Sequence, residues 1–235
     1  MMMKPNKKTA RLAGLFFLLM VVFGLFAEIF FRQKLFDPND AAATASNILS
    51  NEFLYRAGVA SDILMSLCYL FTALVLYKLL APVNKNLAAM MVVFAAAGCI
   101  MLLCNIQSEF APLTILSGNE YMGTFNASQL QSLAMQSYQS YQHGYVIGQV
   151  FFALWVLPLG VLIYRSRFIP KAFGILFVLE AILAFLAVFV HFLVPNESIE
   201  TILMVPGIIA EFSFVFWLLI WGIKESKLPV QQTEL

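Results

Sequence analysis

Six long apolar runs, separated by short polar segments, are the dominant pattern of this 235-residue chain. An α-helix rises 1.5 Å per residue, so a run of about 20 residues covers the roughly 30 Å hydrocarbon core of a bilayer. The pattern therefore predicts an all-α, polytopic integral membrane protein whose six transmembrane helices form a single membrane domain, residues 1–235. The expected spans are about 12–31, 56–80, 87–110, 141–164, 172–193 and 203–223.

The polar segments between the spans predict two short helices at the outer membrane interface. One covers about 40–50, where an Ala-rich stretch follows Asp37-Pro38. The other covers about 127–140 and opens at Asn126 and Gln129, whose spacing is typical of a capping box. Pro112 is expected to end the third span, because a proline disfavours helix in the residue before it.

The lysines and arginines next to the spans predict the orientation of the chain, because cytoplasmic loops are enriched in these residues. Only Arg32, Lys34 and Arg56, of the 14 in the chain, fall on one side. The opposite side is therefore predicted to be cytoplasmic, with both termini there. The segment from Arg32 to Tyr55 is then an outer loop.

Composition supports a membrane protein and narrows its partners. Hydrophobic residues make up 61% of the chain and charged residues 11%, against about 25% charged in soluble domains. The sequence has no basic patch with interleaved aromatics, so nucleic acid is not an expected partner. The expected partner is the lipid bilayer, with a small molecule or lipid as a candidate ligand. The oligomeric state and any cofactor are not predicted. The three cysteines lie inside apolar runs and are interpreted as packing residues.

Polar residues inside the spans are the candidate chemistry. Each ionisable side chain costs at least about 2.5–3.5 kcal/mol at the bilayer centre on insertion scales, so it requires a partner or water. Counted from the predicted cytoplasmic ends, most of these residues lie in the outer half of the spans, while Glu180 lies near the midplane. The candidate ligand-binding residues are Glu28, Arg56, Asp62, Asn105, Glu109, His143 and Glu211.

Helical spacing groups some of these residues. Glu180 and His191 share a stripe with two alanines between them, and Asn105 shares a face with Glu109. A glycine precedes Glu28, Asp62 and Glu211 by one helical turn, at Gly24, Gly58 and Gly207. Such glycines predict a close neighbour, or space for water or a ligand group, beside each carboxyl.

Several interpretations of these residues stay open. The leading one is a non-enzymatic protein with an outward-facing polar cavity that binds a small molecule, ion or lipid headgroup. The residues expected to line this cavity are Glu28, Asp62, Glu109, His143, His191 and Glu211. A second is a structural or accessory subunit, whose acids hold the helices together by pairing with Arg32, Arg56 or the histidines. A third is an intramembrane metal-dependent hydrolase or transferase acting on lipid, with His143, His191 and two of the acids as metal ligands. The sequence contains no P-loop, GxSxG or HExxH motif that would indicate a reaction.

Ordered landmarks along the chain resemble a known family. They are Asp40–Leu49, Phe53–Gly58 with Asp62, Leu79–Lys85, Gly148–Phe152, and Leu162–Ser166 with Pro170 and Gly174. This pattern, from about Ala10 to Ile223, resembles the signature of an uncharacterised bacterial membrane family, domain of unknown function 4386. The resemblance implies a multi-pass protein of the bacterial plasma (inner) membrane and supplies no reaction. It ranks Asp62 and Arg56 above Glu180 as candidate functional positions, because they lie in the segment most like the family.

Overall fold

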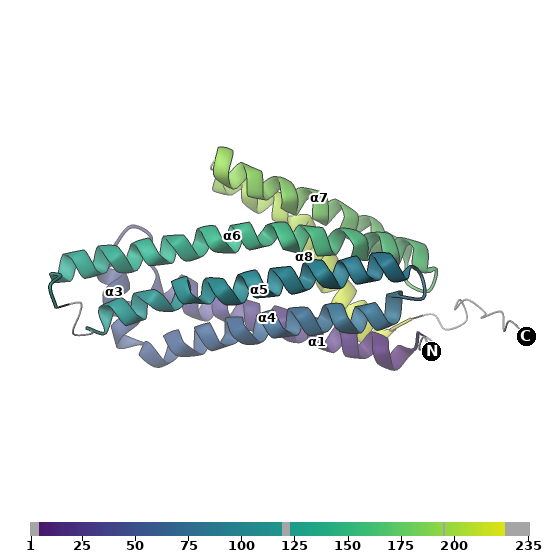
Figure 1. Cartoon of the computed structure of the whole chain (residues 1–235), viewed down its shortest axis with the longest axis horizontal. Coiled ribbons are helices and arrows are strands. Elements are labelled where there is room, and N and C mark those ends of the chain that lie inside the picture. Colours follow the sequence, from purple (N-terminus) through teal and green to yellow (C-terminus); the bar gives the residue numbers. More distant parts are fainter. Residues whose placement is uncertain (1–4, 119–122, 195, 224–235) are drawn as a thin grey trace, which may run out of the picture. The chain divides into compact units, whose positions relative to one another are not determined.

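The computed structural model describes residues 5–118, 123–194 and 196–223, and all regular structure in these ranges is helical. The helices appear in chain order in Figure 1. Their bounds are α1 Lys7–Leu25, the π-helical segment η1 Phe26–Arg32, α2 Gln33–Leu35, α3 Ala41–Ser50, α4 Glu52–Leu80, α5 Lys85–Leu116, α6 Ala127–Ser166, α7 Lys171–Leu193 and α8 Glu197–Ile220.

The described residues contain six helices that are long and apolar enough to cross a membrane. They confirm the predicted all-α, multi-pass architecture, and each contains most of one predicted span. The first runs without interruption through α1, η1 and α2, from Lys7 to Leu35. Arg32 therefore lies inside this helix. The prediction that Arg32 begins an outer loop is wrong. The sidedness of the loops stays a prediction.

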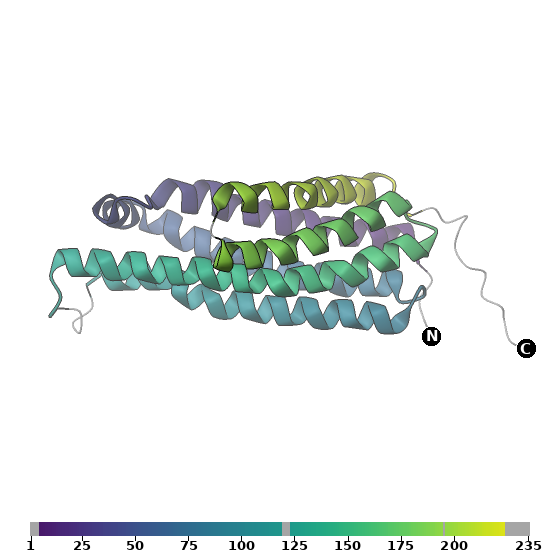
Figure 2. The same ribbon diagram turned by 90° about the horizontal axis from the view of Figure 1, so that it is seen from above.

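Two predicted helix boundaries are wrong. The third spanning helix continues through Pro112 to Leu116, because a proline inside a membrane helix is tolerated where neighbouring groups satisfy the freed backbone. The short helix expected over 127–140 is not separate from the fourth span. Residues 127–166 form one continuous helix, α6, which is unbroken in both Figure 1 and Figure 2.

The predicted helix starts at Asp40 and Asn126 are confirmed. The Asp40 carboxylate accepts hydrogen bonds from the backbone N–H groups of Ala42 and Ala43, which caps α3. The backbone N–H of Asn126 donates to Gln129 Oε1 at 2.9 Å, and the backbone N–H of Gln129 donates to Asn126 Oδ1 at 3.0 Å. This reciprocal pair is the capping box that the spacing predicted. The interfacial position of the two segments stays a prediction.

The chain forms two compact units. The first unit comprises the described residues of Met1–Leu18, Tyr69–Gly98 and Gln149–Leu235, and the second comprises Leu19–Cys68 and Cys99–Gly148. Four helices, α1, α4, α5 and α6, continue from one unit into the other along the chain. The single-domain organisation stays a prediction.

Close backbone contact between α6 and α7 organises the first unit. A Cβ atom added to Gly174 would lie 2.6 Å from the Tyr164 backbone nitrogen and 2.8 Å from the Gly160 carbonyl oxygen. Backbone atoms cannot yield as a flexible side chain can, so both helices depend on glycine here. α7 also packs along α8, as Figures 1 and 2 both show.

A Gly174→Ala substitution is expected to destabilise this unit by about 1–3 kcal/mol, because the added methyl overpacks a backbone contact. Gly148→Ala is the matched control, since its Cβ would meet only Leu102 Cδ2 at 3.5 Å. The control should leave stability unchanged or raise it, because alanine favours helix over glycine by up to about 1 kcal/mol. Thermal unfolding of both variants in one detergent checks this, and equal midpoints would contradict it.

Candidate functional site

A π-helical turn at the end of α1 positions Arg32. The segment η1, Phe26–Arg32, bonds its backbone in the wider i to i+5 pattern, which often marks functional sites. This wider turn changes the direction in which the next side chains point. Phe31 and Arg32 are both buried at the end of the turn, whereas Phe30 is exposed.

The Arg32 guanidinium is the centre of a charged cluster drawn from four spanning helices. Its Nη1 donates to Asp62 Oδ2 at 2.6 Å, to Glu109 Oε1 at 2.9 Å and to the Tyr141 hydroxyl at 3.0 Å. Its Nε donates to Glu28 Oε2 at 2.8 Å. Asp62 comes from α4, Glu109 from α5 and Tyr141 from α6. We call these five residues the Arg32 cluster; all of them belong to the second unit.

The core of the Arg32 cluster is buried, and its edge is exposed. The side chains of Arg32, Asp62 and Glu109 are 10%, 4% and 0% exposed, whereas the side chain of Glu28 is 48% exposed. No hydrogen-bond donor in the described protein reaches Asp62 Oδ1 or Glu109 Oε2, although both atoms are buried. The two carboxyl groups also lie close enough to form a hydrogen bond with each other when one of them is protonated. The cluster thus contains two adjacent carboxyls, and each has one oxygen that receives no hydrogen bond from the rest of the described protein.

Aromatic residues surround the cluster. Phe31 packs edge-on against Tyr55 with ring centroids 4.8 Å apart, and Phe36 stacks on Tyr138 at 3.6 Å. The Tyr55 hydroxyl donates to the backbone carbonyl of Glu109, so the ring also fixes the turn of α5 that carries this acid. Ile48 brings α3 into the same apolar layer. Such a layer keeps water from the buried charges and strengthens their mutual attraction.

Two glycines provide space for the residues around the cluster. A Cβ atom on Gly58 would lie 2.2 Å from Phe31 Cγ, and one on Gly144 would lie 2.1 Å from Asn105 Oδ1. The Asn105 amide nitrogen donates to the backbone carbonyl of Tyr141 at 2.8 Å. The missing side chain of each glycine thus leaves space for a neighbouring side chain, and Asn105 is hydrogen-bonded to the backbone of Tyr141, a residue of the cluster.

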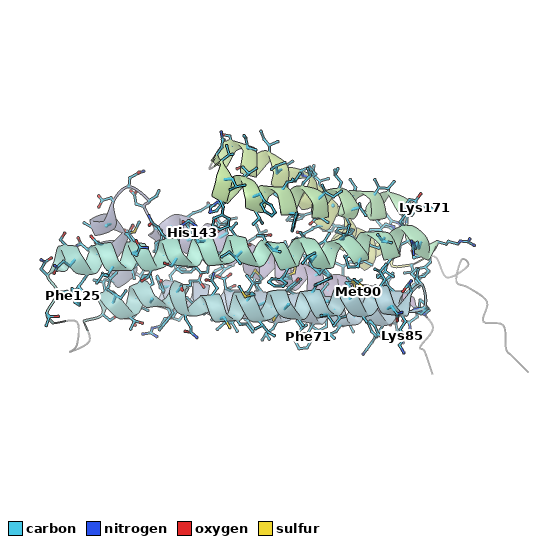
Figure 3. All side chains as sticks on the ribbon, turned by 45° about the horizontal axis from the view of Figure 1, so that its top comes forward. Phe71, Lys85, Met90, Phe125, His143 and Lys171 are labelled. Carbon is cyan, nitrogen blue, oxygen red and sulfur yellow. The ribbon has the colours of Figure 1, made fainter. Side chains whose placement is uncertain are left out.

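The structure therefore brings together three of the predicted site residues, Glu28, Asp62 and Glu109, with Asn105 one contact away. Arg56 lies elsewhere: its Nη2 pairs with Glu52 Oε1 at 2.7 Å, and both side chains are more than half exposed. His143 has an exposed side chain on α6 (Figure 3). Arg32 was considered only as a pairing partner, although the Glu28–Arg32 spacing of four residues could have indicated that the helix continues.

Glu211 and His191 belong to the first unit, where each has its own surroundings. His191 Nδ1 lies 3.0 Å from Glu200 Oε2, and Glu211 lies close to Glu180. Among the described residues, no group of three or more His, Cys, Asp or Glu side chains has the arrangement of a metal site. The metal-ligand hypothesis for His143 and His191 thus gains no support from the geometry.

Comparison with known proteins gives one match. Residues 12–222 match a family model described as a domain of unknown function, DUF4386. No curated protein and no solved structure matches the chain.

Proposed function

We propose that this chain, which belongs to the DUF4386 family of multi-pass membrane proteins, binds a small monovalent cation at the Arg32 cluster. The supporting observation is the pair of buried carboxylate oxygens, on Asp62 and Glu109, that no donor of the described protein reaches. We further propose that the protein resides in the bacterial plasma membrane, with this cluster in the outer half of its helices.

Charge balance supports a monovalent ligand. The buried part of the cluster contains one guanidinium and two carboxylates, so it carries one negative charge when all three groups are ionised. An uncompensated charge is costly in a water-excluded site, and a bound cation would neutralise it. A proton is the smallest such cation and competes with any other for the same oxygens.

The half-exposed Glu28 offers a place at which a cation can enter the site. Its carboxylate accepts from Arg32 Nε at 2.8 Å and from the Gln33 amide at 3.1 Å. A negative group at the edge of a buried acidic site raises the local concentration of cations. The unpaired carboxylate oxygens thus give cation binding a specific observation that the lipid-hydrolase alternative lacks. The ion pairs of Arg32 by themselves also fit the accessory-subunit alternative, in which acids hold the helices together.

Binding can be measured by calorimetry on protein purified in lipid nanodiscs. Lithium, sodium, potassium and ammonium chloride are titrated separately, with choline chloride holding the ionic strength constant. We expect saturable binding of at least one of these cations. Asp62→Asn or Glu109→Gln should weaken it about 10- to 100-fold, because a hydrogen bond or contact to a charged group contributes about 1.5–3 kcal/mol.

Glu52→Gln is the matched control. Glu52 makes an exposed ion pair with Arg56 on α4, so this substitution also removes one carboxylate from an arginine but leaves the Arg32 cluster intact. The control should bind like the wild type. Absence of saturable binding for all four cations in the wild type, or equal weakening by the control, would overturn the proposal.

A further inference from the structure

A second pair of acids lies between α7 and α8 in the first unit. The Glu180 side chain of α7 packs directly on Gly207 of α8, where an added Cβ would lie 2.8 Å from Glu180 Cγ and 3.0 Å from its Cδ. Glu211 follows Gly207 by one turn on the same face, and its carboxyl lies close enough to interact electrostatically with that of Glu180. Because a helical side chain leans over the preceding turn, Glu211 and Glu180 both lie at the α7–α8 contact near Gly207.

Both carboxyls lack a partner within the described part of the protein. Glu180 is only 4% exposed, and no donor reaches Glu180 Oε2 or Glu211 Oε1, which are both buried. No ion pair among the described residues joins either acid to a basic side chain. The Arg32 cluster holds a guanidinium, so this second pair differs from it in having no fixed positive charge.

Two ionised carboxylates at such a place would repel each other in surroundings that exclude water. Two ionised acids in a membrane-spanning region cost free energy unless a counter-ion compensates their charge. A cation held between the two carboxyls removes their mutual repulsion and leaves one negative charge shared by the pair. Carboxylate oxygens are hard ligands that suit a proton or an alkali metal ion.

We propose that Glu180 and Glu211 form a second cation site, distinct from the Arg32 cluster, in which the two carboxyls share one monovalent cation. In the absence of metal ions the cation is a proton, which forms a hydrogen bond from one carboxyl to the other. Lithium or sodium can take its place and displace the proton to water, so one positive charge enters as one leaves.

Infrared difference spectroscopy tests this exchange on purified protein in nanodiscs. Replacement of choline by sodium or lithium should reduce the absorption of a protonated carboxyl and increase that of a carboxylate. In the Asp62→Asn/Glu109→Gln background, where the Arg32 cluster contributes no exchangeable carboxyl, a pH-indicator dye should report one proton released per chain. In that background, Glu180→Gln and Glu211→Gln should each abolish both signals. Glu200→Gln, an acid of α8 that pairs with His191, is the matched control and should keep them.

Three further results decide the proposal. A carboxyl band that responds to pH alone, and that is lost in both glutamine variants, supports a site that takes only protons. An unchanged signal in Glu180→Gln overturns the proposal. Absence of a protonated carboxyl in the wild type under all of these conditions overturns it as well, and this second result does not depend on whether a variant folds. The Asp62→Asn/Glu109→Gln variant should keep the signal, which separates this site from the Arg32 cluster.

Discussion

Replacement of Arg32 by methionine is expected to lower the free energy of unfolding by about 3–5 kcal/mol, because it leaves buried carboxylates without their partner. Asp62 and Glu109 both bind Arg32 Nη1, and their side chains are 4% and 0% exposed. Methionine keeps much of the apolar volume of the arginine stem, so the lost charge dominates the result. Denaturation of both proteins in the same mixed micelles measures the difference.

Arg56→Met is the matched control for this experiment. Arg56 also pairs with a glutamate four residues earlier in its helix, but its ion pair is exposed. An exposed pair contributes about 0–1 kcal/mol, so the control should change stability little. The triple variant Arg32→Met/Asp62→Asn/Glu109→Gln should recover much of the loss, because it removes the stranded charges together with the arginine. Equal effects of Arg32→Met and Arg56→Met would contradict a buried charged cluster.

Gly58→Ala should also destabilise the protein, because its methyl would occupy the place of the Phe31 ring. Three Phe31 atoms lie 2.2–2.6 Å from the added Cβ, and Phe31 is fully buried next to Arg32. Overpacking of this kind costs about 1–3 kcal/mol. A shifted Phe31 also moves Arg32, so we expect cation binding to weaken together with stability.

Gly24→Ala is the control for Gly58→Ala, since each glycine precedes an acid of the cluster by one turn. Its Cβ would meet the Met65 sulfur at 3.1 Å, and a methionine side chain can adjust because it is long and flexible. Thermal unfolding and calorimetry on both variants should therefore separate them clearly. A Gly58→Ala protein as stable as Gly24→Ala would show that Phe31 does not position Arg32.

The spanning helices could be predicted because they depend on the average hydrophobicity of a long segment. Twenty apolar residues satisfy the bilayer whatever their exact packing, so all six were located from hydrophobicity alone. Helix ends depend on single residues and were predicted less well. Pro112 was expected to stop α5, and the polar residues before Tyr141 were assigned to a separate helix, yet both helices continue.

The acids of the site could be recognised, but their partner could not. Asp62 and Glu109 are conspicuous because they interrupt apolar runs, whereas Arg32 stands at the end of one and resembles a loop residue. Its burial depends on the π turn η1, which no regular period predicts. Arg56 shows the opposite error: it lies in the segment with the strongest family resemblance, but its side chain is exposed beside Glu52.

The glycine pattern carried more information than its spacing indicated. Gly58 and Gly207 were expected to leave a close neighbour or open space beside an acid. The structure places the Phe31 ring at Gly58 and the Glu180 side chain at Gly207. A single sequence shows where a side chain is missing, but which neighbour fills the place depends on helix pairs distant in the chain.

The central claim, that the Arg32 cluster binds a cation, is tested most directly by the dependence of stability on cation concentration. A ligand that binds only the folded state adds RT ln(1 + [L]/Kd) to the free energy of unfolding. The unfolding midpoint of the wild type should therefore rise steadily with the concentration of the bound cation, at constant ionic strength. The midpoint of Asp62→Asn/Glu109→Gln should rise less steeply, because only the Glu180–Glu211 site then contributes to the dependence on cation concentration. Identical slopes in the two proteins would contradict the claim.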